Sequence, residues 1–176
     1  AAKAQAAKKA EIARQKAGIM RRGVPCLSAA QAPEVAAALD DHAASIGTSV
    51  VALERDINWG ALPDGGFTIG SGTGQFHMPA PSLHGAHQQA NAALAAAALT
   101  TVCPGITTSE LASGLKKAQW PGRLQELSSG ALRDITSGRV WLDGAHNALG
   151  AAALAAELTL LDDGKWHFLC GALETR

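Results

Sequence analysis

The segment 140–147, Val-Trp-Leu-Asp-Gly-Ala-His-Asn, is the part of this chain that most constrains its fold. A short apolar run ends at Asp143, and an alanine-rich run typical of a helix begins directly after Asn147. In open α/β sheets, ligands bind where the carboxyl end of a strand meets a tight turn, and the next helix offers unpaired N–H groups to an anion. The segment therefore predicts an α/β fold with a nucleotide site at this corner. A strand-capping Asp143 and a His146 bonded to local backbone would produce the same pattern.

The composition narrows the class of protein. Of the 176 residues, 47% are hydrophobic and 17% are charged, which is enough for a buried core and excludes a disordered chain. Fifteen basic and fifteen acidic residues cancel, and only 4% are aromatic, so neither nucleic acid nor an anionic membrane is an expected partner. Three cysteines without a paired spacing favour the reducing cytoplasm. Cys26 and Cys170 lie in apolar runs and are expected to be small core residues.

The rest of the chain alternates predicted helices and strands. Between 63 and 78 an antiparallel excursion is expected, with strands at 67–69 and 75–78 around glycine-rich turns. The helices are expected at 1–17, 31–46, 88–99, from 107 or 108 to 118, and 148–161. Further strands are expected at 24–28, 50–53, 139–142 and 166–170. The last strand–helix–strand unit cannot bury both faces of its own sheet, so either more polypeptide follows or this unit packs on the first part of the chain.

Four stretches of the chain occur in a characteristic order. They read Ile-Ala-Arg-Gln-Lys-Ala-Gly-Ile at 12–19 with Gly-Val-Pro at 23–25, then Gly-Ala-His-Gln at 85–88 with Asn-Ala-Ala-Leu at 91–94. Trp-Pro-Gly-Arg-Leu follows at 120–124 and Leu-Asp-Gly-Ala-His-Asn at 142–147. Each motif alone has little specificity. Together they resemble the dihydrofolate synthase/folylpolyglutamate synthase family, a branch of the Mur-ligase superfamily, over nearly the whole chain.

The resemblance implies a domain organisation. It predicts the second half of a Mur-ligase-type central ATPase domain at 1–125, a linker at 126–130, and the start of a Rossmann-like C-terminal domain at 131–176. The P-loop and the acidic and histidine magnesium ligands of the family would lie before Ala1. The 176 residues alone are therefore expected to be inactive.

The resemblance also implies a reaction, which is ATP-dependent amide formation. A carboxylate of dihydropteroate or folate is phosphorylated by ATP, and the amine of L-glutamate then attacks the acyl phosphate. Bringing two anions together requires cations, oriented N–H groups and Mg²⁺. ATP and Mg²⁺ are therefore the expected cofactors of a cytoplasmic enzyme, taken to be a monomer.

Two residues of the first 125 carry roles that the resemblance implies. Lys16 matches a family lysine that becomes carbamylated beside a magnesium site, which gives an anionic oxygen ligand. Composition alone would make Lys16 a solvated lysine at a helix end. Asn91 matches an asparagine on the adenine side of ATP, where an amide supplies both a donor and an acceptor. Without the family, Asn91 would be a polar residue on an exposed helix face. His87 and Gln88 could line the same pocket.

Three later residues are implied to face the nucleotide as well. Arg123 matches an arginine at the domain junction, whose planar fork suits phosphate or ribose oxygens. Asp143 matches an acid whose oxygens suit ribose hydroxyls. His146 would lie beside the phosphates and act in catalysis.

The chain departs from the family pattern at three positions. Gln15 replaces a glutamate, Arg22 replaces a proline, and Ala148 replaces the proline after His-Asn. Two alternatives to the folate ligase stay open. One is a Mur ligase of peptidoglycan synthesis, which shares the mechanism. The other is a non-catalytic, truncated nucleotide-binding paralogue, which the missing P-loop would suit.

Overall fold

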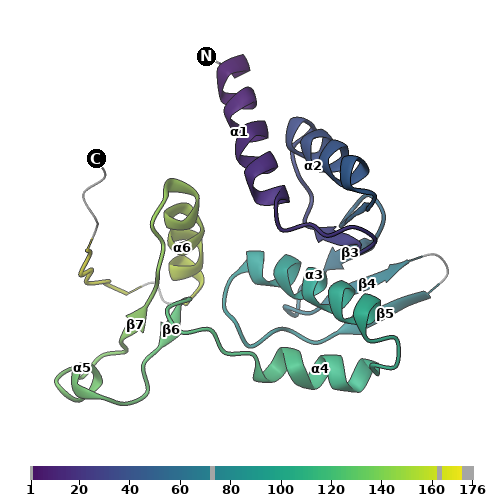
Figure 1. The fold of residues 1–176 in the computed structure, drawn as a ribbon. Helices are drawn as coiled ribbons and strands as arrows, with labels where there is room; N and C mark the ends of the chain where they lie inside the picture. Colours follow the sequence, from purple (N-terminus) through teal and green to yellow (C-terminus); the bar gives the residue numbers. More distant parts are fainter. Residues whose placement is uncertain (1, 72–73, 162–163, 172–176) are drawn as a thin grey trace.

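The chain folds into two lobes that are joined by a single connection after α4 (Figure 1). A computed structural model describes residues 2–71, 74–161 and 164–171. We call 2–118 the N-terminal lobe, 119–124 the junction and 125–171 the C-terminal lobe. Ala1, residues 72–73 of the predicted glycine-rich turn, and residues 162–163 and 172–176 of the predicted C-terminal domain lie outside the described residues.

The first part of the N-terminal lobe is a helix–strand–helix–strand unit. The parallel strands β1 and β2 pair with Cys26 opposite Val50, and α1 packs against α2. Helix α2 ends at Gly47, whose φ of 75° lets its N–H bond to the last turn. The four predicted elements of this part are confirmed, with shorter strands. Their bounds are α1 Ala2–Ala17, β1 Cys26–Ser28, α2 Pro33–Ile46 and β2 Val50–Ala52.

A three-stranded antiparallel sheet and two helices complete the N-terminal lobe. The predicted excursion is confirmed, but it has one strand more than expected, because β3 pairs with β4 along its whole length. Thr107 caps α4 in a capping box with Glu110, as its position before the predicted helix suggested. The bounds are β3 Asn58–Ala61, β4 Phe67–Ser71, β5 Gly74–Met78, α3 Ala86–Val102 and α4 Thr108–Lys117.

The core of the N-terminal lobe lies between this sheet and α3. Phe67 is completely buried, and Leu53, Ile69 and Met78 surround it in one cluster. Helix α3 faces the cluster with a stripe of buried alanines at positions 92, 93, 96 and 97. Small side chains let the helix backbone approach the sheet closely, so this alanine-rich segment forms a packed face rather than a solvated helix.

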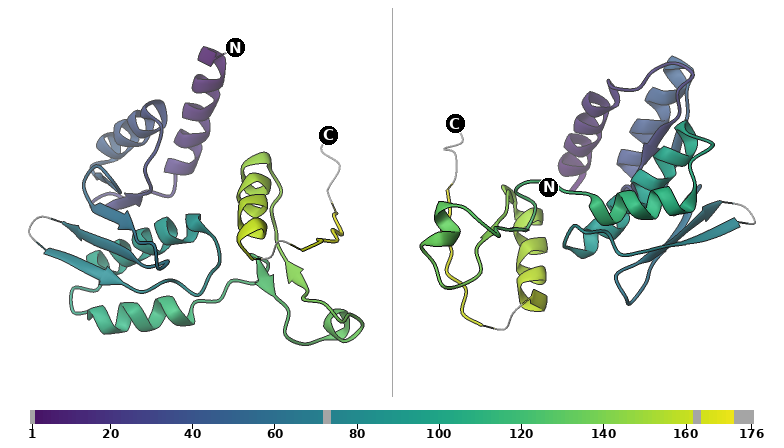
Figure 2. Two further views of the ribbon diagram at one scale, coloured as in Figure 1. Left: turned by 180° about the vertical axis from the view of Figure 1, so that it is seen from behind. Right: turned by 90° about the horizontal axis from the view of Figure 1, so that it is seen from below.

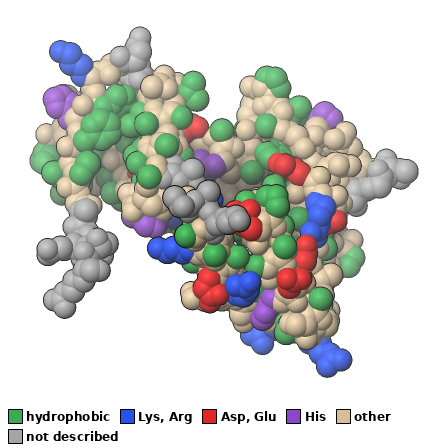
Figure 3. Space-filling view, turned by 90° about the horizontal axis from the view of Figure 1, so that it is seen from above, with side chains coloured by type: hydrophobic (Ala, Val, Ile, Leu, Met, Phe, Trp, Pro, Cys, Tyr) green, Lys and Arg blue, Asp and Glu red, His purple; other side chains and the backbone are tan. Residues whose placement is uncertain are grey.

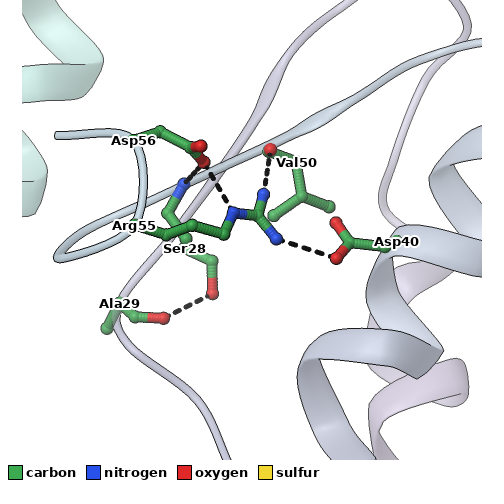
Figure 4. Close-up of polar contacts among 7 residues, drawn as sticks. Ser28, Ala29, Asp40, Val50, Arg55 and Asp56 are labelled. Atoms are coloured by element: carbon green, nitrogen blue, oxygen red, sulfur yellow. Dashed lines mark hydrogen bonds and ion pairs between the residues drawn. The ribbon is translucent and has the colours of Figure 1, made fainter. Parts of the chain in front are cut away.

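A polar network fixes the end of the parallel pair (Figure 4). Arg55 donates to the Val50 carbonyl at 2.6 Å, to Asp40 at 2.8 Å and to Asp56 at 2.9 Å. Asp56 also accepts the Ala52 N–H at 2.8 Å. That backbone bond, with the Arg55 bond, lowers the pKa of Asp56. The network ties α2 to the turn after β2 at the surface of the lobe.

The C-terminal lobe is a short antiparallel strand pair with two helices. Its elements are β6 Gln125–Glu126, α5 Ala131–Asp134, β7 Trp141–Leu142 and α6 Ala148–Leu161. The predicted bounds of α6 are confirmed. The predicted strand–helix–strand unit is wrong, because β7 pairs antiparallel with β6 and residues 166–170 form no strand. Hydrophobicity alone suggested that last strand, but the segment is largely exposed.

The sequence predicted that Cys26 and Cys170 are core residues, and neither is fully buried. Cys26 is half-buried, and burial raises the pKa of its thiol. Cys170 is exposed, so its predicted core role is wrong. The segment that holds it lies along the surface of the C-terminal lobe instead of inside a sheet.

The two lobes present different surfaces. Seen from above, charged side chains gather over the N-terminal lobe, whereas the C-terminal lobe shows mainly hydrophobic and uncharged groups (Figure 3). Views from behind and below show the lobes side by side, with α6 next to the N-terminal lobe (Figure 2). Within the described residues, no helix is long and apolar enough to cross a membrane.

Candidate functional site

A cavity of about 880 Å³ lies between the two lobes. Its walls come from α3, the junction, the turn after β7 and α6. Its volume falls within the range of roughly 300–1,000 Å³ that is usual for small-molecule sites. The structure brings together six residues singled out from the sequence, although they span 60 positions of the chain: His87, Gln88, Asn91, Arg123, Asp143 and His146.

The first turn of α3 forms one wall. Gly85 precedes the helix with a φ of 118°, and a Cβ at this position would lie 2.5 Å from Cε1 of His87. Only glycine therefore lets the His87 ring fold back over the start of the helix. Gln88 is buried, and its Oε1 accepts a bond from Nδ2 of Asn91 at 3.0 Å. An amide has a second N–H and an acceptor oxygen besides, which suit the edge of a purine.

The junction presents Arg123 on a tight turn. The Arg123 N–H bonds to the Trp120 carbonyl at 3.2 Å, with Pro121 second and Gly122 third at a φ of 73°. Pro followed by a residue of positive φ is the pattern of a type II turn, so local sequence sets this geometry. The Arg123 side chain is exposed and lines the cavity. Its fixed positive charge suits an anionic ligand.

The turn after β7 supplies the third wall. Asp143 is half-buried and accepts two backbone N–H bonds, and His146 has Nδ1 3.0 Å from the Gly144 carbonyl. Asn147 accepts the Gly150 N–H at 2.8 Å and so caps α6. The local bonding that would explain this motif without a ligand is therefore present. Asp143 and His146 nevertheless both line the cavity, and one nitrogen of the imidazole is left for a ligand.

Two contacts between the lobes border the cavity. Glu157 on α6 accepts the N–H of Ala86, at the start of α3, at 2.8 Å. His84 lies edge-on to Trp141, with ring centroids 5.5 Å apart, and Trp141 is also covered by Arg139. Glu157 could not be found from the sequence, because an isolated glutamate in an alanine-rich helix gives no sign of its partner 71 residues away.

Lys16 lies apart from these residues. It is exposed at the end of α1 and is not among the residues that line the cavity. Within the described residues, no group of three or more His, Cys, Asp or Glu side chains is placed to hold a metal ion. These residues therefore do not form a complete magnesium site, and the carbamylation of Lys16 stays a prediction.

Comparison with known proteins assigns the chain to a family. It is 34% identical over 157 residues to the dihydrofolate synthase/folylpolyglutamate synthase of Bacillus subtilis, which covers 82% of this chain and 34% of that protein. It is 30% identical over 163 residues to the folylpolyglutamate synthase of Lacticaseibacillus casei, which covers 85% and 35%. The chain belongs to the dihydrofolate synthase/folylpolyglutamate synthase family. The resemblance that the four motifs carry is thereby confirmed.

Solved structures of this family share the fold. The apo form of L. casei FPGS matches with a TM-score of 0.71 and 27% identity, covering 88% of this chain and 38% of that one. E. coli FolC in complex with DHPP and ADP matches with a TM-score of 0.71 and 27% identity, covering 89% and 34%. No family model matches the chain. The chain spans about a third of the length of these curated relatives.

Proposed function

We propose that this chain forms the nucleotide-holding part of an ATP-dependent ligase that joins L-glutamate to dihydropteroate or folate. The cavity between the lobes carries this proposal, because it gathers an amide, a guanidinium and an imidazole in one place. The family supports it, since its solved members include a complex of FPGS with AMPPCP and folate. The reaction would proceed through an acyl phosphate on the folate or pteroate carboxylate.

Each direct contact in the proposal follows from the chemistry of one side chain. Asn91 would pair with the adenine edge, because its amide offers both a donor and an acceptor. Arg123 would hold phosphate or ribose oxygens through charge-assisted bonds. His146 would donate to a phosphate and favour charge that develops there during transfer. A site between two lobes also keeps water away from a reactive acyl phosphate.

This chain would supply few of the ligands of the proposed Mg²⁺. The described residues contain no group of three or more His, Cys, Asp or Glu side chains that could hold a metal ion. The carbamate of Lys16 is the ligand that we assign to this chain. The proposed domain bounds, 1–125 and 131–176 with a linker at 126–130, and the proposed cytoplasmic monomer likewise stay predictions.

The test is glutamate ligation by the complete gene product with ATP and either dihydropteroate or folate. Arg123→Ala should raise the KM for ATP and lower kcat/KM by roughly 10- to 150-fold, the value of a charge-assisted bond of about 1.5–3 kcal/mol. Arg133→Ala is the matched control, because this exposed arginine on α5 donates to the Thr136 carbonyl and does not line the cavity. Unchanged ATP kinetics in Arg123→Ala would remove Arg123 from the nucleotide site.

The same assay separates the rival functions. Ligation of a peptidoglycan precursor instead of a folate would identify a Mur ligase. Binding of ATP without any ligation by the complete gene product would identify a non-catalytic protein. The 176-residue chain by itself should ligate nothing, because its sequence contains no P-loop to hold the phosphates.

A further inference from the structure

The first turn of α3 is capped by the other lobe. Gly85 stands at the N-cap of this helix and offers no side chain to cap it. The first N–H groups of a helix have no partner within it, so another segment can satisfy one of them. Glu157, on α6 of the C-terminal lobe, does so, since its Oε1 accepts the Ala86 N–H at 2.8 Å. A carboxylate is favoured at this end of a helix, where the peptide dipoles present positive charge.

The capped turn carries the amide groups of the cavity wall. Gln88 lies two residues after Ala86 and is only 6% exposed. Its Oε1 accepts a bond from Nδ2 of Asn91 at 3.0 Å. Asn91 is exposed, so this bond rather than packing sets the direction of its amide. Two hydrogen bonds, with the first turn of α3 between them, therefore connect Glu157 to Asn91.

Glu157 is better suited to hold this turn than to contact the nucleotide. It is half-buried and lines the cavity, but a carboxylate repels phosphate groups. The helix that carries it begins directly after the turn that holds His146. Helix α6 therefore joins the phosphate side of the proposed site to the cap of the base side.

We propose that Glu157 is a positioning residue for the adenine side of the nucleotide site, acting through the first turn of α3 and the bond between Gln88 and Asn91. This inference rests on the proposed function, because it assumes that the cavity holds ATP with its base at Asn91. The cap exists only while α6 lies against the start of α3. The adenine side is thus complete only when the two lobes are in contact.

The first test compares two nucleotides in the complete gene product. Glu157→Ala removes the cap, and the loss of a helix cap changes an equilibrium by roughly 2- to 30-fold. We expect the KM for ATP to rise by this factor, with kcat within about twofold of the unaltered value, because the cap does not act on the reacting phosphates. Purine riboside triphosphate lacks the 6-amino group that Asn91 would contact. Its KM should rise less, so the preference for ATP should decrease.

Two further variants separate positioning from a general loss of structure. Misfolding would lower kcat and leave the preference for ATP unchanged, and that result in Glu157→Ala would overturn the proposal. Glu157→Gln keeps an acceptor oxygen for the Ala86 N–H and should keep the preference. A decrease as large as in Glu157→Ala would also overturn it. Thr159→Ala is the matched control, because this exposed residue of α6 donates to the Ala156 carbonyl and does not line the cavity.

A second test asks whether Glu157 acts through Asn91. In an Asn91→Ala background, the further change Glu157→Ala should raise the KM for ATP by less than about twofold, because residues that act through one another do not add. A full additional rise would contradict the proposal. If the unaltered gene product shows no ATP-dependent ligation, the proposed function fails. If it ligates with ATP but does not prefer ATP to purine riboside triphosphate, the proposed function stands and the role of Glu157 falls.

Discussion

The two lobes are stabilised in different ways. The N-terminal lobe has a contiguous apolar core around Phe67, with sheet and helices packed on it. In the C-terminal lobe, Leu158 is the one buried hydrophobic residue among those described, while Leu160, Phe168 and Leu169 are exposed. Polar contacts connect this lobe to the rest of the chain, chiefly those of Asp143 and Glu157.

The cavity has one firmly packed side and one side that is held mainly by hydrogen bonds. The walls from the N-terminal lobe are rigid, because α3 is fixed by its alanine stripe on the sheet. The walls from the C-terminal lobe depend on a few hydrogen bonds, which open at a lower free energy than a packed core. Helix α6 is apolar apart from Glu157 and Thr159, a composition typical of a helix that packs against other protein.

The largest effect is expected at Lys16. It lies in the N-terminal lobe, outside the cavity, yet Lys16→Ala in the complete gene product should lower activity by more than about 100-fold, as loss of a metal ligand would. Added short carboxylic acids should restore part of the activity by filling the vacated space. Lys9→Ala, also exposed on α1, is the control and should change little. If Lys16→Ala keeps normal glutamate ligation, Lys16 is no metal ligand and is a solvated lysine at the end of α1.

Core substitutions test the difference in packing directly. Phe67→Ala should lower the free energy of unfolding by about 3–5 kcal/mol, because its side chain is completely buried. Leu158→Ala should cost nearer 2 kcal/mol, since fewer buried neighbours surround it. Urea denaturation followed by circular dichroism measures both. Equal losses would mean that the C-terminal lobe is packed as well as the N-terminal one.

Glu157 tests the contact that bridges the lobes. The first N–H groups of a helix have no partner within it, so exchange at the Ala86 amide reports the Glu157 bond directly. Glu157→Ala should speed that exchange and destabilise the protein by about 0.5–2 kcal/mol. Glu157→Gln keeps an acceptor oxygen and should have a smaller effect. Equal exchange at Ala86 in all three proteins would show that α6 does not hold α3.

The smallest effect expected concerns pH. A bond from Arg139 lowers the pKa of Glu126 in the C-terminal lobe, as the backbone bond from Ala52 does for Asp56 in the N-terminal lobe. A carboxyl with a lowered pKa in the folded state stabilises the fold above its unfolded pKa, and this contribution is lost as the pH falls. Thermal stability should therefore decline below about pH 4. Glu126→Gln and Asp56→Asn should each make that decline less steep. If thermal stability falls equally steeply with pH in both variants, these two carboxyl groups do not cause the decline.

Much of the local structure was predictable because short-range chemistry sets it. The capping box of Thr107, the Pro-Gly turn before Arg123 and the bounds of α6 follow from neighbouring residues. The strand at 166–170 was wrongly predicted from its hydrophobicity, because a strand also needs a neighbour with which to pair. Strand β3 was missed, since its sequence shows no clear alternation and its pairing with β4 defines it.

The longer helices, the tight turns, the family and six of the residues that line the cavity could be predicted from the sequence. The bonds that these residues form with distant segments depend on the tertiary structure. Asp143 bonds to the backbone of Leu124, and Glu157 bonds to Ala86, across 19 and 71 positions respectively. A motif shows which chemical groups are present, but a hydrogen bond depends on distance and direction, and folding alone sets these between segments far apart in the chain.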